Sequence, residues 1–259
     1  MASLSHERYC DEIIRLTQEL RSAINGADLE ATVPTCPAWT LRELAVHLGG
    51  AHRWAGEIVR TRATEALGEE QVPAFTPDGD DPAVLDAWLA DGAAGTAEVL
   101  RKAGPGLKVW SWYGRDRSAG FWARRMAIET VVHLADAALT AKVPYTMSPE
   151  LAADTIDEWL DIVAGAQAEG DAEAAELRGA GRSIHLHATD VPDAEWIVEF
   201  DEDGFTWRRA HGKATVALRG PLTDLMLVFN RRLAPDSDRV ELLGEAELLD
   251  FWLARSSFG

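Results

Sequence analysis

The sequence predicts an α+β protein in which a helical bundle precedes a small α+β domain with an antiparallel sheet. Apolar residues recur at helical spacings of three and four up to about residue 165, whereas beyond Arg182 they alternate with polar residues. Residues 166–180, between the two patterns, are rich in small and acidic side chains, which is typical of a linker, although 168–177 would also fit an exposed helix. We therefore expect domains at 1–165 and 181–259 joined by this linker.

Five helices are expected in the N-terminal domain, each from its periodicity and its end signals. A capping box at Thr40–Glu43 opens the second helix, and a capping residue followed by proline opens the third at Asp81 and the fifth at Ser148. Glycine and proline clusters mark the connecting loops. The expected helices cover residues 4–24, 41–60, 82–103, 121–139 and 149–163.

The C-terminal domain is expected to contain short antiparallel strands followed by two helices. Apolar residues alternate with polar ones around residues 184–188, 196–200, 205–207 and 216–218, with glycine or acidic turns between them. Gly220 and Pro221 then open a helix that runs to Phe229, and residues 245–254 form a last short helix.

Charge and composition exclude several classes of partner. The chain carries 43 acidic against 25 basic side chains, a net charge of −18, and lacks a basic patch, so we expect no nucleic-acid or membrane partner. The charged N-terminus resembles neither a signal peptide nor a membrane span, which predicts a cytoplasmic protein. The two cysteines are expected to be small apolar residues, with Cys36 a weaker candidate for a reactive thiol.

The most informative segment is the expected helix at 121–139. It places Glu129, His133 and Asp136 on one stripe of an otherwise apolar surface, because their spacings of four and three residues each span about one helical turn. A buried carboxylate and imidazole need a partner or a metal. One interpretation is a satisfied network, with Glu129 paired to Arg125 and His133 bonded to Asp136.

The other interpretation is a metal site, which needs a ligand from a second helix. His47, on the inward side of the helix at 41–60, supplies it. Two imidazoles and one carboxylate leave coordination positions open, as at a catalytic zinc, and Asp136 would then orient His133. His52 is expected at the surface. His185 and His187 share one strand face, where we expect them to be solvated and not to bind metal.

Several of these segments together resemble the mycothiol-dependent maleylpyruvate isomerase family, within the DinB-like four-helix-bundle superfamily. The N-terminal resemblance lies in CPAWTLRELAVHLGGAHRW (36–54) and FWARRMAIETVVHLADA (121–137). The C-terminal resemblance lies in GRSIHLHATD (181–190), HGKATVALRGPLTDLMLVFNRR (211–232) and LLGEAELLDFWL (242–253). The resemblance implies a DinB-like bundle with His47, Glu129 and His133 as zinc ligands, and mycothiol as the thiol cosubstrate.

The activity that this resemblance implies is attack of a metal-activated thiolate on a small electrophile, as in an S-transferase or a cis-trans isomerase. Arg219 is the preferred candidate for binding an anionic electrophile and Arg231 the next, while Trp54 would wall the pocket or belong to the core. Nickel or iron would also suit the ligands. A metal-dependent hydrolase and a non-catalytic metal-binding sensor or partner module are the alternatives. A monomer or small homo-oligomer is expected.

Overall fold

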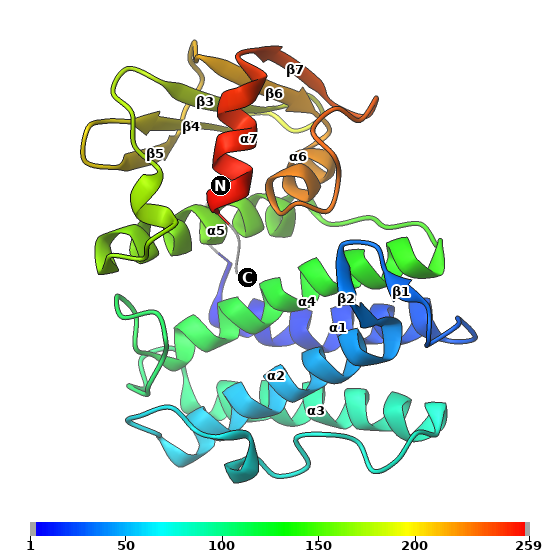
Figure 1. The fold of residues 1–259 in the computed structure, drawn as a ribbon. Coiled ribbons are helices and arrows are strands. Elements are labelled where there is room, and N and C mark those ends of the chain that lie inside the picture. Colours follow the sequence, from blue (N-terminus) through cyan, green and yellow to red (C-terminus); the bar gives the residue numbers. More distant parts are fainter. Residues whose placement is uncertain (1–3, 257–259) are drawn as a thin grey trace. The chain divides into compact units, whose positions relative to one another are not determined.

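The computed structural model describes residues 4–256, and their contacts divide the chain into two compact units (Figure 1). The N-terminal unit spans Leu4–Tyr145, and the C-terminal unit begins at Thr146. The boundary therefore precedes the expected linker, because helix α5 (Pro149–Glu169) packs with elements of the C-terminal unit. None of the helices described is long and apolar enough to span a bilayer.

The N-terminal unit is a bundle of four helices whose order follows the sequence prediction. Helices α1 and α2 each pack against both α3 and α4. The bundle comprises α1 (His6–Ile24), α2 (Leu41–Thr61), α3 (Pro82–Ala103) and α4 (Ala119–Ala141).

Local sequence signals set the starts of these helices. The Thr40 hydroxyl accepts a hydrogen bond from the Glu43 amide, and the Glu43 carboxylate accepts one from the Thr40 amide, so the predicted capping box is present. Asp81 caps α3 just before its proline. Such a cap stabilises a helix by about 1 kcal/mol. The capping box therefore fixes where α2 begins, and with it the side of the helix on which His47 lies.

Helix α4 is the most enclosed element of the bundle. Its charged and polar residues Arg125, His133 and Asp136 are as buried as its apolar ones. A two-stranded hairpin formed by β1 (Thr32–Val33) and β2 (Cys36–Thr40) contacts α4 where a loop was expected. Strands this short carry no periodic signal, which is why the hairpin was not predicted.

The C-terminal unit contains a five-stranded sheet in the order β5-β4-β3-β6-β7, which confirms the α+β class. Strands β3 and β6 pair in parallel and the other neighbours antiparallel, so the sheet is mixed and not purely antiparallel as expected. Its elements are β3 (Ser183–Ala188), β4 (Glu195–Phe200), β5 (Phe205–Arg209), β6 (Val216–Gly220), α6 (Leu222–Phe229), β7 (Glu241–Gly244) and α7 (Ala246–Arg255).

Helices cover one face of this sheet. Trp196 on β4 donates its indole N–H to Asp157 of α5 at 2.7 Å, and Trp252 of α7 packs against Phe200 and Phe205. Side chains alternate between the two faces of a strand. The opposite face therefore carries His185, His187 and Glu195.

Candidate metal centre

Helices α2 and α4 bring the three predicted ligands together. The Glu129 Oε1 atom lies 3.2 Å from Nε2 of His47 and 3.0 Å from Nε2 of His133. One ligand atom from each residue lies within 4.8 Å of the others, and the two imidazole rings meet edge to face with centroids 5.1 Å apart. Side chains 82 residues apart in sequence thus converge on one carboxylate oxygen.

Glu129 uses its two oxygens differently. Its Oε2 accepts a hydrogen bond from Nη2 of Arg125 at 2.7 Å, one helical turn earlier, whereas Oε1 faces the two histidines. Burial would raise the pKa of Glu129, but Arg125 and His133 hold it well below its ordinary value, so the side chain is a carboxylate. The ion pair with Arg125 therefore fixes the group while leaving one oxygen available.

His133 is held in one orientation by the opposite side of its ring. Its Nδ1 lies 2.9 Å from Oδ2 of the fully buried Asp136, whose Oδ1 accepts a hydrogen bond from Oγ1 of Thr35 at 2.5 Å. Burial would lower the pKa of His133, but Glu129 and Asp136 raise it to about 9. Without a metal the ring therefore carries both protons at pH 7. When a cation displaces the proton on Nε2, the proton that stays on Nδ1 faces Asp136 and the Nε2 lone pair points at the site shared with His47 and Glu129.

The donor set and its spacing fit a divalent cation. Ligands about 2.0–2.1 Å from a tetrahedral zinc lie about 3.4 Å from one another, close to the 3.0 and 3.2 Å separations found here. The side chain of His47 is 39% exposed and that of His133 only 8%, so the site opens to solvent on the His47 side. Three protein ligands and an open side leave room for a small molecule.

The hairpin contributes residues that sequence reasoning missed. The Trp39 ring lies 4.6 Å from that of His47 and 6.1 Å from that of His133, and Thr35 contacts Asp136 as described. Cys36 Sγ lies 4.0 Å from Asp136 Oδ2. For Trp39, the sequence signal was its position immediately before the capping box that starts α2, the helix that carries His47.

The remaining predicted site residues have other partners. Trp54 packs against Trp110 and Trp122 and donates its indole N–H to the Leu67 carbonyl, so packing accounts for this side chain. Arg219 lies on β6 and pairs with Glu241 at 2.7 Å.

Arg231 follows α6 and is exposed, with a left-handed backbone at φ 64°. Both arginines belong to the C-terminal unit, and their role in substrate binding remains a prediction.

The prediction for His52 was wrong, because this histidine is fully buried. Five residues beyond His47 it is rotated about 140° around α2, and that side of the helix is also enclosed. Its Nε2 lies 2.9 Å from Oγ1 of Thr130. Burial lowers the pKa of His52 to about 4, so the ring is neutral at pH 7.

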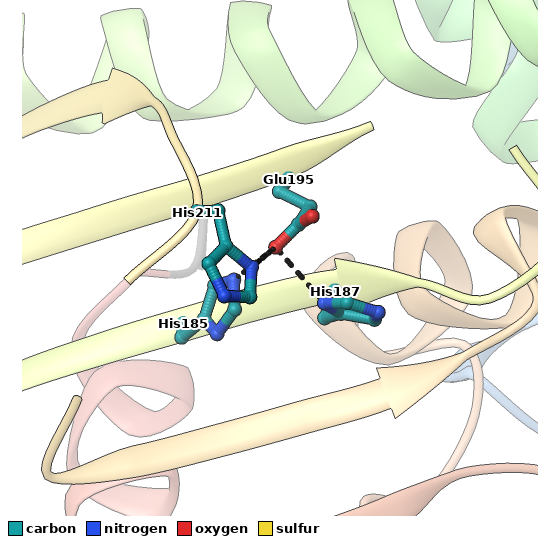
Figure 2. Close-up of side chains that lie close together, drawn as sticks. All are labelled: His185, His187, Glu195 and His211. Atoms are coloured by element: carbon teal, nitrogen blue, oxygen red, sulfur yellow. Dashed lines mark hydrogen bonds and ion pairs between the residues drawn. The ribbon is translucent and has the colours of Figure 1, made fainter. Parts of the chain in front are cut away.

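The expectation that His185 and His187 lie on a solvated face was wrong for His185. Glu195 on the neighbouring strand and His211 beyond β5 join the two histidines (Figure 2). His185 is only 5% exposed. The missing information was strand register, which the sequence pattern did not specify.

Comparisons with known proteins place the chain in a family. The family model described as mycothiol maleylpyruvate isomerase N-terminal domain matches residues 10–138, and the one described as MDMPI C-terminal domain matches residues 150–251. No curated protein matches the sequence.

Among solved structures, a mycothiol-dependent maleylpyruvate isomerase aligns with a TM-score of 0.65 at 17% identity over 95% of this chain and 97% of that one. A histidine-to-alanine mutant of a mycothiol-dependent maleylpyruvate isomerase aligns with a TM-score of 0.57 at 16% identity and the same coverage. At such identities these two likenesses concern the fold. The two domain models together span most of the sequence, and the chain therefore belongs to the mycothiol maleylpyruvate isomerase family of enzymes.

Proposed function

We propose that this protein is a zinc-dependent, mycothiol-using enzyme of the isomerase or S-transferase type. The observation that carries the proposal is the convergence of His47 and His133 on one oxygen of Glu129, with the His47 side open to solvent. Family membership supports mycothiol as the thiol. The electrophile is a small molecule, and the class of reaction depends on whether the thiol departs or stays attached.

The role of the metal follows from the chemistry of thiols. A bound zinc ion keeps a thiol ionised at neutral pH, where a free thiol with a pKa of about 8.5 is mostly protonated. With zinc bound, two neutral imidazoles and the single carboxylate would cancel only one of its two positive charges. The residues His47, Glu129 and His133 would therefore leave a net positive charge that favours an anionic sulfur ligand over a neutral one.

The protein's own residues hold this centre in place. Asp136 keeps the proton of His133 on Nδ1, and Arg125 keeps Glu129 ionised and oriented. In an isomerase, the thiolate would add to an electron-poor double bond, and the resulting single bond would rotate. Elimination would then break the C–S bond, re-form the double bond in the trans geometry and release the thiolate. In a transferase, the thiolate displaces a leaving group and stays attached. Arg219 and Arg231 are our candidates for binding an anionic electrophile.

The test combines metal analysis with a thiol-dependent assay. Purified protein should contain zinc, consume mycothiol or convert a cis-electrophile in its presence, and lose this activity in a His47→Ala variant. A His6→Ala variant is the matched control, because His6 is half-buried in the same unit and, among the residues that the structure describes, its ring bonds only to the Leu100 carbonyl. Normal turnover by His47→Ala would contradict the mechanism. Turnover without added thiol would instead indicate a metal-dependent hydrolase.

A further inference from the structure

A second cluster of metal-binding side chains lies in the C-terminal unit, on the sheet face opposite its helices (Figure 2). The Glu195 Oε2 atom lies 2.7 Å from Nε2 of His185, 2.9 Å from Nδ1 of His187 and 2.7 Å from Nδ1 of His211. One ligand atom from each of the four residues lies within 4.8 Å of the others. Three imidazole nitrogens thus meet at a single carboxylate oxygen.

Strand register explains how the cluster forms. His185 and His187 are two residues apart on β3 and so share a face, and His187 is paired directly with Glu195 on β4. His211 lies in the segment between β5 and β6. Because β4 and β3 lie between these two strands in the sheet, this segment has to cross both of them. Three separate parts of the chain therefore contribute to one point.

Hydrogen bonding alone explains this arrangement poorly. A carboxylate oxygen offers about two lone-pair sites, so three N–H donors cannot all approach the same oxygen in good geometry. In addition, each ring would have to carry its proton on the nitrogen that faces Glu195. A cation at the shared point removes both difficulties, because lone pairs and not protons then point inward.

The spacing of the rings matches a zinc site. Imidazoles bound to a tetrahedral zinc through nitrogens about 2.0–2.1 Å away have ring centroids about 5 Å apart. The three centroid separations are 5.5 Å for His185 to His187, 5.5 Å for His185 to His211 and 5.9 Å for His187 to His211. To reach bonding distance, the rings would move together by less than about 1 Å, and the Glu195 oxygen, now 2.7–2.9 Å from the nitrogens, would move outward to about 3.4 Å from them. The side chain of His211 is 74% exposed, so little packing opposes its movement.

We propose that His185, His187, Glu195 and His211 form a second metal site that binds one divalent cation of the zinc class. Four protein ligands fill a tetrahedral coordination shell, whereas the site in the helical bundle has three and stays open. The second site is therefore structural: it fastens the segment that carries His211 onto the sheet. This proposal does not depend on the proposed function of the first site.

Zinc titration of the metal-free full-length protein tests the proposal, with stoichiometry measured by calorimetry and elemental analysis. The wild type should bind two equivalents, one for each cluster. His47→Ala should retain one of them, with visible absorption typical of tetrahedral coordination when cobalt replaces zinc. His211→Ala should retain only the site in the bundle, and its exposed side chain makes this variant safe for folding.

A pair of carboxylate variants supplies the matched control. Glu195 and Glu199 lie on the same strand and the same face, but Glu199 pairs with Arg208. Glu195→Gln should weaken the second site by about a hundredfold or more, because loss of a ligand exceeds the 10–100-fold effect of a neighbouring group, and Glu199→Gln should leave it unchanged. Zinc at a hundred times its dissociation constant should raise the melting temperature of the C-terminal unit by roughly 10 °C in Glu199→Gln but not in His211→Ala.

The outcomes separate the two proposals. Binding of one equivalent that is lost in His47→Ala and kept in His211→Ala would overturn the second site and leave the first. Binding of one equivalent that is lost in His211→Ala and kept in His47→Ala would support the second site and remove the first. Absence of any bound zinc would overturn both.

Discussion

Replacing Asp136 with asparagine tests whether the buried carboxylate behind His133 sets the affinity of the bundle's metal site. Asp136 is fully buried, and its two oxygens are occupied by Nδ1 of His133 at 2.9 Å and Oγ1 of Thr35 at 2.5 Å. Asparagine has nearly the same shape but no charge. It lowers the basicity of the imidazole and can also present its NH2 group to Nδ1, which would move the ring proton to the metal-binding nitrogen.

The expected magnitude follows from the position of Asp136 behind the ligand. Loss of such a partner weakens metal binding by about 10–100-fold, which corresponds to about 1.4–2.7 kcal/mol. Thr35→Val is the graded control, because it removes only the hydroxyl that orients Asp136 and keeps the carboxylate. We expect it to weaken zinc binding by less than Asp136→Asn does.

Competition with a chromophoric chelator measures both dissociation constants at pH 7. Circular dichroism and denaturant unfolding establish that each variant is folded before the titration. If the zinc dissociation constant of Asp136→Asn were within about threefold of that of the wild type, Asp136 would have no role in positioning His133 for a metal. Asp136 would then not set which nitrogen of His133 carries the proton.

Three further predictions concern charge, an aromatic contact and pH. Arg125→Met should destabilise the metal-free protein by about 1–3 kcal/mol, since it leaves the Oε2 atom of Glu129 without its donor, and zinc should reverse part of the loss in urea unfolding; equal losses with and without zinc would contradict this. Trp39→Ala should weaken zinc binding by roughly 2–10-fold, because the ring that packs against His47 at 36° contributes about 0.5–1.5 kcal/mol to its orientation, and an unchanged dissociation constant would refute the contact's importance. The free energy of unfolding should fall by about 2 kcal/mol from pH 7 to pH 5 through His52 alone, whose pKa rises from about 4 when folded to 6.5 when unfolded, so that the unfolded chain binds the proton in this window. Urea unfolding of His52→Gln should show a smaller loss between these pH values, and an identical pH dependence would show that His52 is not the group responsible.

The convergence of the candidate ligands in the bundle was predictable from sequence because helical geometry relates residue spacing directly to position in space. Glu129, His133 and Asp136 form one stripe wherever the helix lies, and the capping box at Thr40 fixes the start of the helix that carries His47. Only the packing of α2 against α4 had to be assumed.

Contacts made by strands and hairpins were not predictable in the same way. Thr35 and Trp39 reach the site through a hairpin too short to show alternation, and Glu195 meets His187 through a register that no local pattern specifies. His52 was misplaced for a different reason: α2 packs on two sides, so its apolar arc is wider than a single stripe. The parallel pairing of β3 and β6 likewise depends on the route of the chain between them.

The hairpin of β1 and β2 has a wider consequence. Thr35 in its turn donates a hydrogen bond to Asp136, and Trp39 on its second strand packs against His47. One small element therefore restrains the surroundings of candidate ligands on two different helices. Elements this short open locally at low energetic cost. We therefore expect substitutions at residues 32–40 to change how His47 and His133 are positioned while leaving every candidate coordinating atom in place.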